Sequence, residues 1–207
     1  MSNKEIPEEF IKWAFVERRE LIKRMMERKA TKEDFLVGFT RHTPAIITHG
    51  PGGLNASIKG VGFVLKDKYL DEVIDHLKEA MKQKRNMMIS AGILMNEIYT
   101  EDYMERIDFT KLMTLELAMK HTWQNLNDNN DATLLFYTPP ETTYEVRCVA
   151  EVHTQGKYWE YANLIHDVFH MFGPIENPDE RKRHPAYIFK IKEIWDNHPD
   201  KMGVRIY

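Results

Sequence analysis

The sequence contains a single cysteine, Cys148, in 207 residues. One cysteine excludes an intramolecular disulfide framework and a cysteine-based zinc site within one chain, and it favours a reducing compartment such as the cytoplasm. A large excess of charge of one sign is also lacking, because 29 basic and 32 acidic side chains give a net charge of -3. This near balance offers no overall electrostatic reason to expect nucleic acid or an anionic membrane as a partner.

Long apolar runs and familiar catalytic motifs are absent from the sequence. No apolar stretch approaches the roughly 20 residues of a membrane-spanning helix, and the N-terminal sequence has no basic start, apolar run and cleavage site of a signal peptide. A nucleophile elbow, a Walker motif and a dinucleotide fingerprint are missing too, which disfavours serine hydrolysis, phosphoryl transfer and NAD chemistry. We therefore expect a soluble, cytoplasmic protein without membrane or nucleic-acid partners.

What the sequence has is enough apolar content, 43%, to build one core. Its length and the absence of a linker predict a single domain, 1–207, in which an N-terminal helical segment at about 5–40 packs on an α+β core. Apolar residues recur at helical spacing from Phe10 to Met25. Thr31–Asp34 resembles a capping box, which predicts a second, short helix. This helix is expected to turn Phe35, Leu36 and Phe39 toward the core.

The remaining chain alternates between strand-like and helix-like patterns. Strands are predicted within 44–65 (two), 87–100, 132–139, 142–153 and 186–195, with a last short one at 204–207, and helices at 67–84, about 110–126 and 157–172. Because helices are interspersed among mainly hairpin-like strands, the fold class is α+β with a mainly antiparallel, barrel-like sheet and flanking helices.

Two loops carry residues that could contact an anion. The glycine-rich stretch 49–53 (HGPGG) separates two predicted strands, and glycines let backbone amides approach a phosphate. It lacks the lysine and serine or threonine of a P-loop, so a hairpin is the simpler interpretation. The basic cluster at 181–184 lies in a charged loop, where contact with solvent is favoured over contact with a ligand.

His166 and His170 are four residues apart in the predicted helix at 157–172. This spacing puts both imidazoles on one face, beside the apolar arc, and can chelate a divalent transition metal. Asp167 stands where metalloproteases have a glutamate base, but it falls near the opposite pole from the apolar arc, which weakens the hydrolase interpretation. A third ligand would have to come from His153, His184 or Glu160. A metal-dependent enzyme using His166 and His170 is therefore one hypothesis, and a solvent-exposed or subunit-interface pair is the other.

Polar residues before the strand at 132–139 form the second candidate site. Lys120, Thr122 and Asn125 could be the solvated side of a helix, or they could join Arg147 of a neighbouring strand to bind a dianion, since charge-assisted donors suit a phosphate. Cys148 falls on the apolar face of its strand and is expected to be inert.

The order of elements from about 115 to 207 resembles the FMN-binding split barrels related to pyridoxamine 5'-phosphate oxidase. The segment KHTWQNL, the two following strands and Arg147-Cys148, in place of the usual Arg-Gly, carry the resemblance, whereas the first half lacks the usual opening strand. The resemblance implies FMN as cofactor, bound at the subunit interface of a homodimer, with Lys120, Thr122, Asn125 and Arg147 near its phosphate. It further implies a flavin-dependent oxidoreductase acting on a small molecule. The absence of a specific catalytic motif keeps a non-catalytic binding or assembly protein as the alternative.

Overall fold

An antiparallel sheet organises the fold. In this computed structural model, which describes residues 5–84, 86–171, 174 and 182–207, the sheet has eight strands. They are β1 (Ala45–Thr48), β2 (Asn55–Ile58), β3 (Gly62–Leu65), β4 (Ile107–Leu115), β5 (Asp131–Thr138), β6 (Thr142–His153), β7 (Ala186–Asp196) and β8 (Val204–Arg205). The order is β2-β1-β5-β6-β7-β4-β3, with β8 paired to β7. The predicted α+β class with an antiparallel sheet is confirmed, although the strands do not close into a barrel.

The two faces of the sheet follow from the alternation in its strands. Leu134 of β5 and Val146 of β6 are partners in register and are fully buried, whereas their neighbours Thr133 and Arg147 are partners on the opposite face. Arg147 is exposed. Because side chains alternate along a strand, one face of the sheet packs on the core and the other carries polar groups.

A three-residue segment, Lys59–Val61, joins the two opposite edges of the sheet. β2 ends at Ile58 and lies at one edge, while β3 begins at Gly62 and lies at the other. The segment is held by hydrogen bonds from Val61 N to His42 O (2.7 Å) and from Thr114 Oγ1 to Gly60 O (2.6 Å). The sheet must therefore curl until its edges approach one another.

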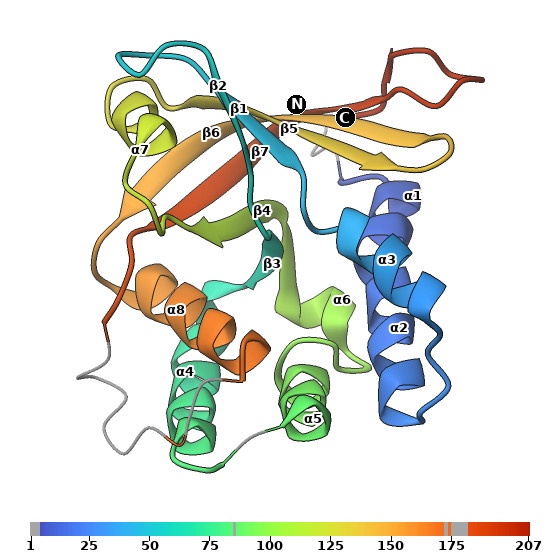
Figure 1. Cartoon of the computed structure of the whole chain (residues 1–207), viewed down its shortest axis with the longest axis vertical. Coiled ribbons are helices and arrows are strands. Elements are labelled where there is room, and N and C mark those ends of the chain that lie inside the picture. The colour runs from blue at the N-terminus through green and yellow to red at the C-terminus, as the bar shows by residue number, and fades with distance from the viewer. Residues whose placement is uncertain (1–4, 85, 172–173, 175–181) are drawn as a thin grey trace.

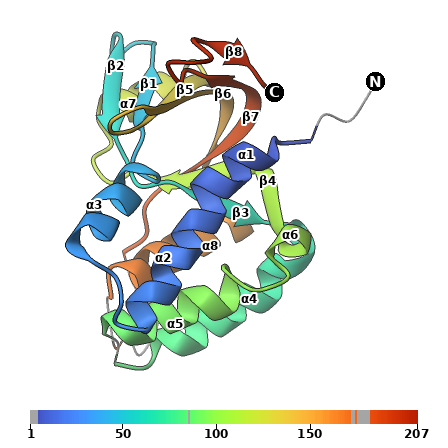
Figure 2. The ribbon, with the colours of Figure 1, turned by 90° about the vertical axis from the view of Figure 1, so that its right-hand side faces the viewer.

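Helices cover the buried face. They are α1 (Glu8–Ile11), the π-helical turn η1 (Lys12–Val16), α2 (Glu17–Met26), α3 (Lys32–Thr40), α4 (Asp67–Met81), α5 (Met87–Glu97), α6 (Tyr103–Arg106), α7 (His121–Leu126) and α8 (Lys157–Phe169). α8 packs on β4, β7, α4 and α5. The continuous run from α1 to α2 extends from the sheet, near α1, to α5, which α2 contacts (Figure 1, Figure 2). None of the helices in the described ranges is long and apolar enough to cross a membrane.

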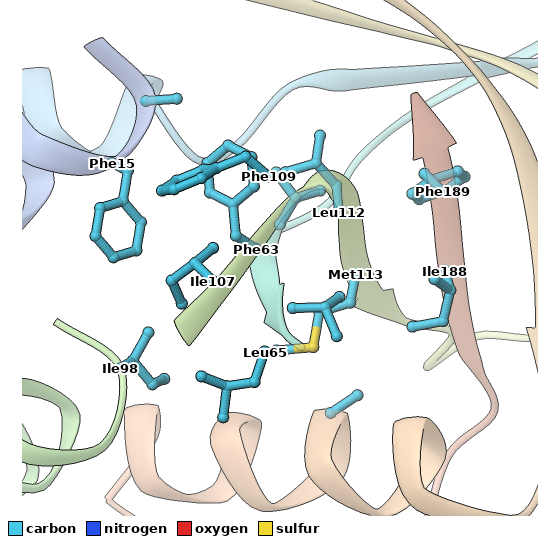
Figure 3. Packing of buried hydrophobic residues seen from close by; sticks show 14 of the residues in the cluster. Phe15, Phe63, Leu65, Ile98, Ile107, Phe109, Leu112, Met113, Ile188 and Phe189 are labelled. Atoms are coloured by element: carbon cyan, nitrogen blue, oxygen red, sulfur yellow. The ribbon is translucent and has the colours of Figure 1, made fainter. Parts of the chain in front are cut away.

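The core lies between these helices and the sheet, and aromatic rings fill much of it. Phe10 is fully buried and makes an edge-to-face contact with Tyr144 of β6 at 5.2 Å between ring centroids. Phe15, Phe63 and Phe109 come together from η1, β3 and β4 (Figure 3). Burial of such a side chain stabilises the fold by about 1.5–3 kcal/mol, so these contacts fix the N-terminal helices on the sheet.

Several predictions of secondary structure are wrong. The segment predicted as a strand at 87–100 is mainly helix α5, because the Asn86 side chain accepts hydrogen bonds from the amides of Met88 and Ile89 and so caps a helix. The helix predicted at about 110–126 is instead strand β4 followed by the short α7. β4 pairs with β3 and β7, and these long-range pairings outweigh the helical spacing of its leucines.

The capping box at Thr31 and Asp34 is confirmed, but α3 does not bury its large apolar side chains. Phe35, Leu36 and Phe39 are 40%, 62% and 58% exposed. The helix instead packs on α2 through Gly38. Residues 175–181 of the charged loop lie outside the described residues. Of the basic cluster at 181–184, Arg183 is 3.6 Å from a carboxylate oxygen of the buried Asp167.

Candidate functional site

Thr122 and Asn125 of α7 are buried and hydrogen-bonded under the β1–β2 hairpin. The Thr122 hydroxyl accepts a bond from the Asn55 amide (2.9 Å) and lies 3.0 Å from the Ser57 hydroxyl. Asn125 is fully buried; its Oδ1 accepts from Gly52 N (2.7 Å), and its Nδ2 donates to Thr48 Oγ1 (3.1 Å) and to the Gly53 carbonyl oxygen (2.8 Å). These two side chains tie α7 to the hairpin.

The glycine-rich loop at 49–53 packs against α7, as its sequence allows. A Cβ atom at Gly50 would lie 3.0 Å from the Asn125 Cα atom, and one at Gly52 would lie 2.9 Å from Asn125 Oδ1. Gly53 has a φ of +78°, a backbone conformation that is strained for residues with a side chain. The glycines therefore serve close approach and a turn, which agrees with the hairpin interpretation of this loop.

Arg147 lies on the opposite face of the sheet from Thr122 and Asn125. Its guanidinium pairs with Glu145 (2.6 Å) and Glu193 (3.2 Å) and lies 4.9 Å from the centre of the Trp195 ring. It lines an open groove on this outer face, together with Asn129. The four predicted phosphate ligands thus do not form one cluster within a single chain. Cys148 is buried and its pKa is raised by burial, which fits the expected inert thiol.

Lys120 is the N-cap residue of α7 and lies at the end of a turn that Glu116 organises. Glu116 is buried, and its Oε1 accepts from the amides of Ala118 (2.9 Å) and Met119 (2.7 Å), while its Oε2 lies 3.0 Å from Lys59 Nζ. Burial opposes ionisation, but the Lys59 ammonium and the two amides outweigh it and lower the pKa of Glu116. Lys120 is exposed and, among the described residues, has no ion pair.

The turn borders a cavity of about 420 Å³ between the sheet and the helices, which sequence reasoning did not foresee. Its walls come from α1, η1, α2, α5, α8, β3, β4, β5 and the segment that joins the sheet edges. They include Phe10, Phe15, Phe63, Leu94, Ile98, Leu112, Phe136 and Ile165. Figure 3 shows Phe15, Phe63, Ile98 and Leu112 directed toward one region. A volume of this size with mainly apolar walls is typical of small-molecule sites.

Large apolar side chains are exposed at the mouth of the cavity. Ile58, Leu117 and Phe169 line it and are 69%, 54% and 39% exposed. Phe169 lies 5.9 Å from the His42 ring, and His42 lies 5.1 Å from the Phe39 ring. Apolar side chains gathered at a concave site mark a surface that a ligand or partner covers.

The polar groups inside the cavity centre on Arg18. Its Nε donates to the Tyr99 hydroxyl at 2.8 Å, its Nη1 contacts His42 Nδ1, and its Cζ lies 5.6 Å from the centre of the Phe169 ring. Burial, and then the charge of Arg18, lower the pKa of His42 from 6.5 to about 3. His42 is therefore neutral at pH 7.

No local sequence pattern indicates this cluster. Arg18 lies 24 residues from His42 and 81 from Tyr99, so no motif could join them. The one available signal was a charged residue in an amphipathic helix whose neighbours Ala14 and Phe15 are apolar.

His166 and His170 also line this cavity, with ring centroids 4.5 Å apart. Burial, and then the neighbouring His166, lower the pKa of His170. Asp167 is buried rather than turned away from the apolar arc, and Asn163 is buried as well. Over the residues that the structure describes, no group of three or more His, Cys, Asp or Glu side chains is placed to hold a metal ion.

Comparison with known proteins gives distant structural matches. No family model matches the chain, and no curated protein matches its sequence. Among solved structures, HupZ of Group A Streptococcus is similar at 15% identity, with a TM-score of 0.46, over 82% of this chain and 94% of that one. A Listeria innocua protein assigned as a pyridoxamine 5'-phosphate oxidase has 10% identity and a TM-score of 0.43, over 80% and 98%. An FMN-binding protein of Syntrophomonas wolfei has 13% identity and a TM-score of 0.38, over 89% and 91%.

These matches confirm, as a weak likeness, the resemblance expected from the sequence. Similarity this distant says nothing about the ligand or reaction of this chain. The function must therefore be inferred from the cavity and its side chains.

Proposed function

We propose that the protein binds FMN at the mouth of the cavity and acts as a flavin-dependent oxidoreductase on a small molecule. The observation that carries the proposal is the group of exposed apolar side chains around an aromatic-walled cavity whose lining residue Ala118 precedes Lys120 by two positions. The isoalloxazine is a flat apolar ring system, and the phosphate of FMN is a dianion. The cavity mouth offers a surface for the first, and Lys120, which has no ion pair among the described residues, offers an ammonium group for the second.

The residues present fit this cofactor in chemistry. Ile58, Leu117 and Phe169 would cover the faces and edges of the ring, and Lys120, two residues beyond the cavity-lining Ala118, would pair with the phosphate. Thr122 and Asn125 keep α7 in place and so position Lys120 at its N-terminus. Bound FMN would supply hydride and electron transfer, while the chain provides binding and orientation.

A homodimer is part of the proposal, as the resemblance implies. The exposed Leu36 and Phe39 of α3 support it, because Phe39 adjoins the cavity mouth through its contact with His42. A second copy placed on these side chains would shield the mouth from water. Light scattering of the full chain measures its molar mass in solution, which should be that of a dimer.

Titration with FMN and with riboflavin tests the cofactor site. We expect FMN to bind with quenching of its fluorescence, and Lys120→Ala to weaken FMN binding about tenfold or more, because a charge-assisted bond to phosphate is lost. Riboflavin lacks the phosphate, so its affinity should be the same for the variant and the natural chain.

Arg147→Ala is the matched control on the outer face of the sheet. It should leave FMN affinity unchanged if the cofactor lies at the cavity mouth. A large loss with Arg147→Ala and none with Lys120→Ala would move the phosphate to the outer groove. Absence of FMN binding would refute the proposal.

A further inference from the structure

Among the described residues, Arg18 has no acidic partner, in contrast to Arg19, Arg24 and Arg41. Arg19 pairs with Glu20 (3.2 Å) and Glu101, Arg24 with Asp34 (2.8 Å), and Arg41 with Glu17. Within the described part of the chain, Arg18 makes no ion pair with a carboxylate. Its charge is nevertheless half-buried and lies in the wall of the cavity.

The polar neighbours of Arg18 do not compensate its charge. Tyr99 accepts a hydrogen bond from Nε through a neutral hydroxyl group, and His42 is a neutral imidazole. The guanidinium also lies over the ring of Phe169, whose interaction with a cation is weaker than an ion pair. A guanidinium placed among apolar side chains without a counter-charge is costly, so such a group usually serves a ligand.

The surroundings also restrict the chemistry of that ligand. Arginine presents a planar fork of N–H donors that matches the two oxygens of a carboxylate. Tyr99 is buried, and its hydroxyl hydrogen, which has no acceptor among the described residues, can donate to the same group. Phe10, Phe15 and Phe63 line the cavity around them and favour an apolar or aromatic body.

We infer that Arg18 binds the carboxylate of a small apolar or aromatic acid, with Tyr99 as a second donor, in the part of the cavity behind the mouth. Carboxylate binding needs no flavin. The further step, that such acids are the substrate class, rests on the proposed flavin function. His42 then positions Arg18 through their contact and does not itself carry charge.

The experiment compares benzoate with benzyl alcohol, which has the same ring and no charge. Calorimetric titration into the full chain, without flavin, should show benzoate binding more tightly than benzyl alcohol. Arg18→Gln should weaken benzoate binding about tenfold or more and leave benzyl alcohol unchanged, because only the charge-assisted pair is lost. Arg18→Lys keeps the charge without the planar fork, so its affinity for benzoate should lie between those of the natural chain and Arg18→Gln.

Arg24→Gln is the matched control, since it removes an arginine of the same helix whose partner is Asp34. It should leave benzoate affinity unchanged. If Arg18→Gln does not fold, Arg18→Lys carries the test alone, and equal benzoate affinity in that variant and the natural chain overturns the inference. Equal affinity of the natural chain for benzoate and benzyl alcohol overturns it too.

The flavin titration separates this inference from the proposed function. Arg18-dependent benzoate binding in a protein that does not bind FMN would refute the flavin proposal and support the carboxylate site. FMN binding that is lost in Arg18→Gln while riboflavin binding persists would show that Arg18 holds the flavin phosphate, and would overturn the carboxylate site.

Discussion

Replacement of Asn125 by alanine decides whether this residue is structural or a ligand contact. The side chain is fully buried and makes three hydrogen bonds, to Gly52 N, Thr48 Oγ1 and the Gly53 carbonyl oxygen. Gly53 is exposed, so water can replace its bond at little cost. The other two bonds contribute about 1 kcal/mol each, and the unfilled space adds to the loss.

Asn125→Ala should therefore lower the free energy of unfolding by about 2–3 kcal/mol. For a chain of this length, that loss corresponds to a fall in Tm of roughly 4–12 °C. Urea unfolding of the flavin-free protein, followed by circular dichroism, measures the change as a shift in midpoint at constant slope.

Asn127→Ala is the control in the residue that follows α7. Asn127 is exposed, and among the described residues its side chain donates only to the Trp123 carbonyl oxygen, at 2.7 Å. We expect its unfolding free energy to stay within about 0.5 kcal/mol of the natural chain. If Asn125→Ala behaves like this control and instead loses affinity for FMN, Asn125 is a cofactor ligand, and the structural role argued above is wrong.

Two further substitutions test the packing of α3 and the turn at Glu116. Gly38→Ala should lower the free energy of unfolding by about 1 kcal/mol, because the new methyl group would meet Leu21 Cδ2 at 2.2 Å. In a Leu21→Ala background the same substitution should raise the free energy of unfolding, because alanine favours helix. Thermal denaturation of the four proteins measures both effects, and an effect of Gly38→Ala with the same sign in both backgrounds would contradict this explanation. Glu116→Gln should cost roughly 2–4 kcal/mol at pH 7, because Lys59 loses its partner. Because the pKa of Glu116 is lowered, its contribution to stability is complete above the ordinary pKa of 4.5 and is lost as the pH falls through the lowered pKa. The urea midpoints of Glu116→Gln and the natural chain should therefore converge in acid. A difference in midpoint that stays constant with pH would refute the ion-pair explanation.

Local patterns predicted the C-terminal half of the fold well. β6 begins and ends where the alternation from Thr142 to His153 indicated, and α8 begins at Lys157 as expected. Both elements are long, and their periodicity is clear over their whole length. The prediction failed for α5 and β4, where apolar side chains are dense enough to fit either period and where a cap or a pairing partner decides.

The candidate site was less accessible to sequence reasoning. Lys120, Thr122 and Asn125 do lie close in the chain, but the structure assigns the last two to hydrogen bonds that hold α7 in place. Alternation placed Arg147 on the polar face of its strand, but only the pairing of β1, β5 and β6 shows that this face lies opposite α7. The cavity is formed by segments distant in sequence, so its cluster of Arg18, His42 and Tyr99 appears only after the chain is folded.

The short link between β2 and β3 limits how the molecule can open. Four Cα–Cα steps separate Ile58 from Gly62, so these two strand ends can never lie more than about 15 Å apart. A ligand therefore cannot enter by spreading the sheet edges. Any widening of the entrance must come from the helical side, where α3 and the end of α8 border it. Insertion of a few residues into Lys59–Val61 would be the direct way to let the two edges of the sheet move apart.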